Sequence, residues 1–167
     1  MKRGIFFPVL VALVAGAIWW LEAKRSAPAS AAPSTVAAAA PDAKRAEREA
    51  LFGAEALAPD VQWRQSGLGY KILAEGSGPA PSIGARAQIN YTGRLKDGTV
   101  FDQSKQPKEM PLSGVLSGLS TGLQLMHPGG KAVFFIPPEL GYGSHQVAGI
   151  APNSGLIFDV ELIAVSR

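Results

Sequence analysis

Tyr91, Phe101 and Asp102 are the residues whose types and spacing first point to a chemical site. They lie on either side of the turn sequence KDGT at 96–99, in which the Asp-Gly dipeptide is a strong hairpin signal. In a hairpin closed by that dipeptide alone, Gly93 faces Asp102, and Tyr91 becomes the diagonal neighbour of Asp102 on the same face. The phenol can then donate a hydrogen bond to the carboxylate and hold it in place.

Pairing alone leaves two interpretations of this hairpin open. In the first, Tyr91 and Asp102 form a structural hydrogen bond inside a packed sheet. In the second, the phenol, the carboxylate and the Phe101 ring line a pocket. Because the ideal register points Phe101 and Asp102 to opposite faces, the pocket requires a β-bulge that re-aims one of them.

Signals for other chemistries are weak. The sequence GLSTG at 118–122 matches a nucleophile elbow, and Glu139 and His145 follow it, but that motif needs a doubly wound parallel sheet. We therefore interpret Ser120 as an ordinary helix residue. The two histidines have no third ligand at metal spacing, and the chain has no cysteine. A net charge of +3 is too small for a nucleic-acid footprint. We expect no metal, no cofactor and no nucleic-acid partner.

The secondary-structure elements that must position these residues are predicted in the segment from residue 61 to the end of the chain. Four segments alternate apolar and polar residues or are rich in β-forming residues, as half-buried antiparallel strands are. They are residues 68–76, 86–92, 131–137 and 155–165. Leu119, Leu123 and Met126 recur at helical spacing before the stop signal HPGG. We expect an α+β domain at 61–167, with a mostly antiparallel sheet and one short helix on it.

Residues 1–25 read as a signal peptide or an N-terminal membrane anchor. A basic start precedes the uncharged run 4–21, which as a helix would span roughly 27 Å, marginally enough for a bilayer core. Its length and the Trp-Trp pair at its end favour a retained anchor, whereas the Ala-Gly-Ala at 15–17 resembles a cleavage site. Either alternative places the rest of the chain outside the cytoplasm, in the periplasm.

Two further segments precede the domain. Residues 26–41 contain only Ala, Pro, Ser, Thr and Val and are predicted to be a linker. Residues 42–60 are predicted to be a short helical spacer, capped by Asp42 and given a small apolar patch by Leu51 and Phe52. No heptad repeat persists, so a spacer is favoured over a dimerisation helix.

Five motifs occur in order along residues 66–165. They are YTGRLKDGTVFD, PLSGVLSGL, GLQLMHPGGK, IPPELGYG and PNSGLIFDVEL. Together they resemble the FKBP family of peptidyl-prolyl isomerases, and the helical lead-in with SGLGYKIL resembles the envelope members of the macrophage-infectivity-potentiator kind. The resemblance implies a five- or six-stranded antiparallel sheet wrapped around one short helix, with an apolar pocket between them.

Carried over by motif, the resemblance also implies two sets of site residues. The catalytic set is Tyr91, Phe101, Asp102, Leu116, Tyr142 and Phe158, and the substrate-binding set is Met110, Val115, Leu119 and Ile150. In this scheme Tyr91 orients Asp102, the Leu116 N–H and the Tyr142 hydroxyl hold substrate carbonyls, and the aromatic rings contact the proline. No metal or cofactor is implied.

Two departures from the family pattern bear on the pocket. Leu119 stands where the family usually has Trp on the pocket floor, so proline and macrolide inhibitors should bind less tightly. The loop after Tyr142, GSHQVAGIAPN, is one residue shorter than in common members, which makes Ile150 the least secure pocket residue.

The function implied is peptidyl-prolyl cis-trans isomerisation that assists the folding of extracytoplasmic proteins. The alternative is a non-catalytic chaperone or proline-peptide-binding module on the same fold. The partners expected are proline-containing unfolded or nascent polypeptides, weakly bound macrolide inhibitors, and a membrane if residues 4–21 are retained.

Overall fold

The structure, a computed structural model, describes residues 36–147 and 149–166. Its elements are α2 (Val36–Phe52), η1 (Ala54–Leu57), β1 (Gln62–Trp63), β2 (Gly69–Ala74), β3 (Arg86–Arg94), β4 (Val100–Gln103), β5 (Lys108–Pro111), η2 (Leu112–Gly114), α3 (Ser117–Leu123), β6 (Lys131–Ile136), η3 (Pro138–Leu140) and β7 (Leu156–Ser166). The predicted signal or anchor segment at 1–25 and most of the predicted linker lie outside these residues.

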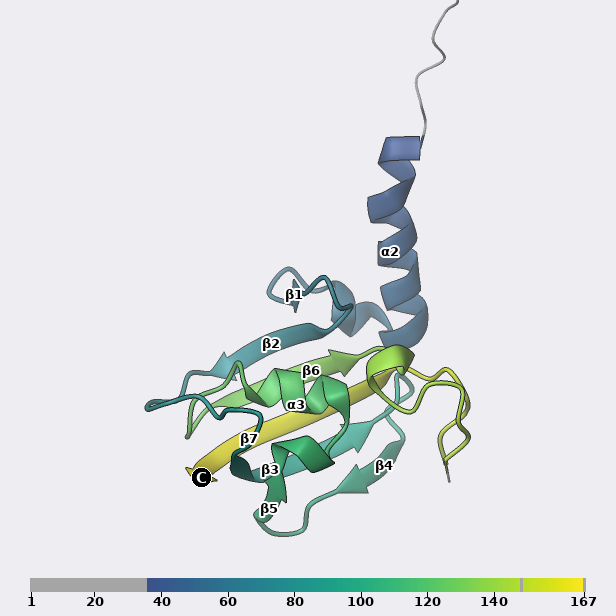
Figure 1. Ribbon diagram of the computed structural model, residues 1–167. Coiled ribbons are helices and arrows are strands. Elements are labelled where there is room, and N and C mark those ends of the chain that lie inside the picture. Colours follow the sequence, from purple (N-terminus) through teal and green to yellow (C-terminus); the bar gives the residue numbers. More distant parts are fainter. Residues whose placement is uncertain (1–35, 148, 167) are drawn as a thin grey trace, which may run out of the picture. The chain divides into compact units, whose positions relative to one another are not determined.

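A single antiparallel sheet carries the fold (Figure 1). Its strand order is β1-β2-β6-β7-β3-β4, and β5 pairs with the beginning of β3, at residues 86–89. The predicted α+β class is confirmed, as are the four predicted strand segments. The sheet has seven strands instead of five or six, because β1 adds a two-residue edge and the long β3 pairs with β4 and β5 in succession.

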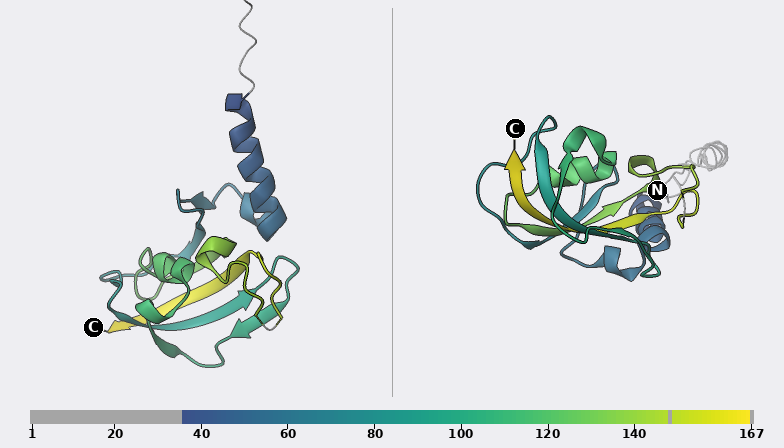
Figure 2. Two further views of the ribbon diagram at one scale, coloured as in Figure 1. Left: turned by 45° about the vertical axis from the view of Figure 1, so that its right-hand side comes forward. Right: turned by 90° about the horizontal axis from the view of Figure 1, so that it is seen from below.

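The sheet curves around α3, which lies across one face (Figure 2). This face and α3 enclose the main hydrophobic cluster, in which Leu119 and Leu123 from the helix meet Phe134 and Phe158 from the sheet. Gly122 permits the close approach, since a Cβ there would lie 2.7 Å from the Phe134 ring. The helix is therefore held against the middle of the sheet.

The opposite face, here called the outer face, carries a second and smaller cluster. It consists of Phe52, Ala56, Val133, Phe135 and Ile157. Consecutive residues of β6 are buried because its two faces pack against different clusters. This explains why residues 131–137 show a continuous apolar run instead of alternation.

The end of α2 belongs to the same compact unit as the sheet, which spans residues 40–167. Two boundary predictions are therefore wrong. The domain begins before residue 61, and the helix begins at Val36 instead of Asp42, because the Ala-rich end of the predicted linker is a strong helix former. Among the helices described, none combines the length and apolar character needed to cross a bilayer.

Candidate functional site

The turn between β3 and β4 is one residue longer than predicted. The Leu95 N–H donates to the Thr99 carbonyl at 2.9 Å, and the Gly98 N–H donates to the Leu95 carbonyl at 2.9 Å. Gly98 has a φ of +84°, the left-handed conformation that closes a three-residue hairpin loop. The two-residue turn expected from the Asp-Gly dipeptide is therefore wrong.

The longer turn shifts the pairing register of β3 and β4 by one residue, and a β-bulge at Phe101 restores it. Arg94 pairs with Val100, but the next residue of β3, Gly93, pairs with Asp102, so Phe101 is the extra residue of β4. The pairing of Gly93 with Asp102 is confirmed although the turn differs, because the longer turn and the bulge offset each other. The bulge is also the feature that the pocket interpretation required.

Tyr91 and Asp102 are joined directly. The Tyr91 hydroxyl donates to Asp102 Oδ2 at 2.9 Å. Burial, together with the hydrogen bond and the negative charge of Asp102, raises the pKa of Tyr91 to about 12. Tyr91 is 7% exposed, whereas Asp102 is exposed at the surface. The phenol is therefore a neutral donor over the whole physiological pH range, aimed at a carboxylate beside the cluster.

Ser104 holds the backbone of Tyr91, a role that was not predicted from the sequence. The Tyr91 N–H donates to Ser104 Oγ at 2.9 Å, and the Ser104 N–H donates to the Tyr91 carbonyl at 2.9 Å. The signal was present in the register, which places Ser104 directly opposite Tyr91. A serine at this position provides hydrogen-bond partners for the backbone N–H and carbonyl of Tyr91, where β4 has already ended.

Phe101 and Phe158 meet beside this pair. Their ring centroids lie 5.6 Å apart at an interplanar angle of 81°, an edge-to-face arrangement, and the Tyr91 ring lies 6.2 Å from that of Phe158. Gly93 makes room for both rings, because a Cβ there would lie 2.7 Å from Phe101 Cζ and 3.0 Å from Phe158 Cε1. The absence of a side chain at Gly93 thus determines where the rings lie.

The predicted site residues gather in one place. Tyr91, Leu119, Ile150 and Phe158 are buried members of the main cluster, and five others pack against it while partly exposed. Those five are Phe101, Met110, Val115, Leu116 and Tyr142. Asp102 joins the set through its hydrogen bond to Tyr91. The arrangement is an apolar surface with a few polar groups at its margin.

Two polar groups lie along this apolar surface. Leu116 immediately precedes α3, and within residues 36–147 and 149–166 its N–H has no hydrogen-bond acceptor. Tyr142 is partly exposed, and it lies near enough to Tyr91 for its hydroxyl to contribute to the raised pKa of Tyr91. Both groups can therefore offer a hydrogen bond to a bound peptide.

The loop after Tyr142 folds back and buries Ile150. The Ile150 N–H donates to the Val147 carbonyl at 2.8 Å, and the Asn153 N–H donates to the Gly143 carbonyl at 2.8 Å. Ile150 is 4% exposed. The residue whose position was least secure from the sequence therefore lies against the same cluster as the others.

The arrangements that a serine hydrolase or a metal site would need are absent from the part of the chain that the structure describes. Ser120 lies inside α3 and not at a strand-to-helix turn, so the nucleophile-elbow arrangement is absent there. The Nδ1 atoms of His127 and His145 lie within hydrogen-bond distance of backbone carbonyls, at 2.6 and 3.1 Å. No group of three or more metal-binding side chains occurs within residues 36–147 and 149–166.

Comparison with known proteins identifies the family. Residues 78–163 match the FKBP-type peptidyl-prolyl cis-trans isomerase domain. The chain belongs to this family. It is 47% identical over 130 residues to a probable FKBP-type peptidyl-prolyl cis-trans isomerase of Haemophilus influenzae, covering 74% of this chain and 54% of that protein. It is 38% identical over 127 residues to the outer membrane protein MIP of Legionella longbeachae, covering 74% and 54%.

Solved FKBP structures agree with this fold. A Pseudomonas syringae peptidyl-prolyl cis-trans isomerase superposes with a TM-score of 0.67 at 36% identity, covering 75% of this chain and 96% of that one. FkpA from Escherichia coli gives a TM-score of 0.67 at 36% identity, covering 92% and 72%. The chain spans about half the length of the curated FKBP relatives that it matches.

Proposed function

We propose that this chain is a peptidyl-prolyl cis-trans isomerase that rotates X-Pro bonds in polypeptides folding outside the cytoplasm. The observation that carries the proposal is the Tyr91–Asp102 hydrogen bond beside the edge-to-face rings of Phe101 and Phe158. These groups form a rigid, largely apolar surface with a polar margin, which suits a reaction in which a bond turns but none breaks.

The chemistry needs only such a surface. Amide resonance sets a barrier of about 18–20 kcal/mol to rotation about a peptide bond. In the transition state the C–N bond loses this resonance and the carbonyl becomes less polar. A site that excludes water stabilises that state relative to the planar, hydrated ground state. Nucleophile, metal and cofactor have no part in this scheme.

Each predicted residue has a role in the proposal. The catalytic set is Tyr91, Phe101, Asp102, Leu116, Tyr142 and Phe158. Tyr91 orients the Asp102 carboxylate beside the twisting amide. The Leu116 N–H and the Tyr142 hydroxyl hold substrate carbonyls, and this role for Leu116 is supported by its N–H just before α3, which has no acceptor among the described residues.

A second set shapes the proline pocket. It consists of Met110, Val115, Leu119 and Ile150. Leu119 forms the floor, since it is 3% exposed and projects from α3 into the main cluster. An isobutyl group offers less contact area than an aromatic ring. We therefore propose weak binding of macrolide inhibitors and modest affinity for proline peptides.

The location outside the cytoplasm is part of the proposal. It is supported by the uncharged run 4–21 and by the relative named as an outer membrane protein. We favour retention of this run as a membrane anchor over its cleavage. Determining the N-terminal sequence of the mature protein tests this, since a chain that begins after residue 17 would show cleavage and exclude the anchor.

Isomerisation of a proline peptide, followed by NMR exchange with the full chain, tests the activity. We expect clear acceleration that is lost in Phe158→Ala and reduced in Asp102→Ala. Ile83→Ala serves as the control, since the Ile83 side chain is 66% exposed and Ile83 belongs to neither set of proposed site residues. No acceleration by a chain that gives the native circular dichroism spectrum would rule out catalysis.

The second candidate function is a non-catalytic chaperone or proline-peptide-binding module. Leu119 is the feature that favours it, because a smaller floor lowers the contact made with the transition state. Peptide binding without acceleration of exchange, in a titration of the same chain, would establish this alternative.

A further inference from the structure

A charged network on the outer face joins the segment after α2 to the strands of the candidate site. Arg94 Nε donates to Asp159 Oδ2 at 2.9 Å, and Arg94 Nη2 donates to both Glu55 carboxylate oxygens at 2.9 Å. The Arg94 side chain is 22% exposed, against 45% for Glu55 and 42% for Asp159. The planar guanidinium thus holds two carboxylates in one geometry, which a lysine ammonium does not reproduce.

Arg94 lies next to the rung on which the aromatic rings meet. It is the last residue of β3, and the rung before it joins Gly93 to Phe158 on β7 and to Asp102 on β4. Successive residues of a strand point to opposite faces. Arg94 and Asp159 therefore lie on the outer face, directly behind the rung that carries the rings.

Buried neighbours hold Glu55 in place. Phe52 and Ala56, on either side of it in the sequence, are 2% and 1% exposed in the outer cluster. The Phe52 ring meets that of Phe135 nearly edge-on, at 5.7 Å and 73°. The backbone at Glu55 is therefore fixed by the docking of segment 52–57, and the two hydrogen bonds from Arg94 hold its carboxylate.

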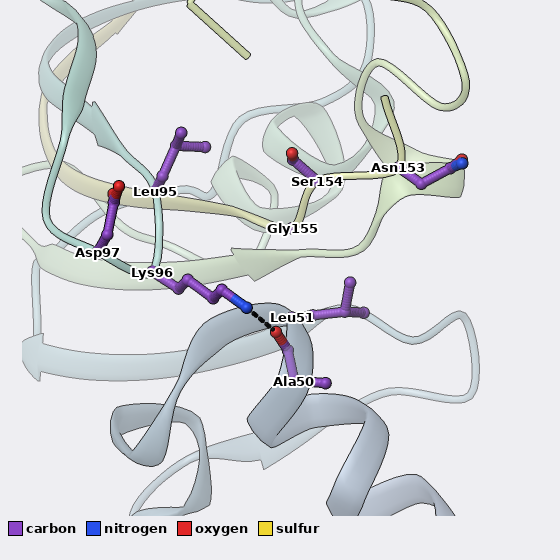
Figure 3. Close-up of a pocket in the computed structure, with 8 residues that line it drawn as sticks. All are labelled: Ala50, Leu51, Leu95, Lys96, Asp97, Asn153, Ser154 and Gly155. Atoms are coloured by element: carbon purple, nitrogen blue, oxygen red, sulfur yellow. Dashed lines mark hydrogen bonds between the residues drawn. The ribbon is translucent and has the colours of Figure 1, made fainter. Parts of the chain in front are cut away.

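A second contact ties the β3–β4 turn to the end of α2, in the hollow shown in Figure 3. Lys96 Nζ donates to the Ala50 carbonyl oxygen at 2.8 Å, one of the carbonyls that a helix end leaves without a helical partner. Across the same hollow the chain at Leu51 lies against Gly155, where a Cβ would be 2.7 Å from the Leu51 carbonyl oxygen. The end of α2 thus contacts both the hairpin and the residues before β7.

We infer that Arg94 is a positioning residue that couples the docking of residues 52–57 to the placement of Phe101 and Phe158. The inference rests on the proposed function, because these rings are the surfaces proposed to contact proline. Moving η1 off the sheet would release one side of Arg94 and loosen the rung at Gly93. The end of α2 and η1 then support the site and are not an inert spacer.

The test compares three variants of the full chain by isomerisation kinetics and by the NMR signals of the Phe101 and Phe158 ring protons. Glu55→Gln removes one charge of the network. Arg94→Lys keeps the positive charge but loses the planar guanidinium that binds both carboxylates. Glu161→Gln is the matched control, since Glu161 lies on β7 on the same face and pairs with Lys131 at 3.2 Å.

We expect kcat/KM to fall about threefold to tenfold in Glu55→Gln and Arg94→Lys, less than the roughly hundredfold cost of a misplacement of about 1 Å. The ring signals should move in both variants, although neither substitution contacts a ring. Both readouts should stay unchanged in Glu161→Gln. Because Glu55 is 45% exposed, we expect its amide variant to keep the fold, and a native circular dichroism spectrum would show that a loss of activity is not caused by unfolding.

The two proposals fail in different ways. If kcat/KM stays within about twofold and the ring signals do not move in Glu55→Gln and Arg94→Lys, the coupling is overturned while the isomerase activity stands. If the unaltered chain shows no isomerase activity, the proposed function fails and the ring signals decide the coupling alone. Moved signals would then support it, and unmoved signals would overturn it.

Discussion

The Tyr91 hydroxyl and the Asp102 carboxylate, diagonal neighbours across the β3–β4 ladder, are joined by a hydrogen bond of 2.9 Å. The backbone of Tyr91 is fixed at the same time by Ser104. Tyr91 is thus fixed both at its backbone and at its hydroxyl, so its hydrogen bond to the carboxylate is preorganised.

The first prediction concerns this pair and pH. The pKa of Tyr91 is about 12 in the folded chain, above its ordinary value of 10.0. Since the folded state holds the phenol proton more tightly, the resulting stability is fully present below about pH 10 and is lost as pH rises through about 12. We expect Tyr91→Phe to lower the free energy of unfolding by about 1 kcal/mol near neutral pH.

The difference between the unaltered chain and Tyr91→Phe should shrink as pH rises from about 10 towards 12. Urea unfolding at a series of pH values measures it. Tyr70→Phe is the control, because it removes an exposed hydroxyl bonded to Gln62. A difference that stays constant up to pH 12 would show that the phenol proton is not held by the fold.

The second prediction concerns Gly93. In Gly93→Ala the new Cβ would collide with the Phe101 and Phe158 rings and force them apart. We expect kcat/KM to fall about tenfold or more and the free energy of unfolding to fall by about 1–3 kcal/mol. Gly84→Ala is the matched control, since a Cβ there meets nothing within 4 Å. Unchanged kcat/KM in Gly93→Ala would place proline away from the two rings.

The third prediction concerns the floor of the pocket. Leu119→Trp adds aromatic surface where proline is proposed to sit. We expect it to tighten binding of a proline peptide and of a macrolide about threefold to tenfold, from an added aromatic contact of about 1 kcal/mol. Calorimetric titration measures this, with Leu119→Phe as an intermediate. Equal affinity in all three proteins would mean that the floor lies elsewhere.

The fourth prediction concerns the end of α2. Phe52 is 2% exposed and packs against both Phe135 and Trp63. We expect Phe52→Ala to lower the free energy of unfolding by about 3–5 kcal/mol, as large-to-small changes in cores do. Leu73→Ala, at a side chain 56% exposed, should change it by less than about 0.5 kcal/mol. A small loss in Phe52→Ala would show that α2 is a separable spacer.

Much of the fold could be predicted because its signals are local. Alternation along 86–92 and 155–165 identified β3 and β7, and the spacing of Leu119 and Leu123 identified α3. The boundary of α2 was misjudged for the opposite reason. Composition made residues 26–41 a linker, but a run of alanines extends a helix once its other end is docked.

The candidate site was likewise predicted in part from the sequence. Residue types and motif order named the ten residues that the structure gathers around one cluster. The details of the hairpin were not readable, since a three-residue turn and a bulge at Phe101 produce the same Gly93–Asp102 pairing as a shorter turn with no bulge. Only long-range contacts separate these two arrangements.

The sequence by itself determined the fold class, the strands and the short helix, and it named the residues of the candidate site, because period, turn chemistry and motif order are properties of short stretches of chain. The tertiary structure alone decided that Phe101 bulges and that residues 50–57 dock on the outer face. The network of Glu55, Arg94 and Asp159 depends on residues far apart in sequence. Such contacts arise from how elements meet in space, for which no single stretch of sequence carries a signal.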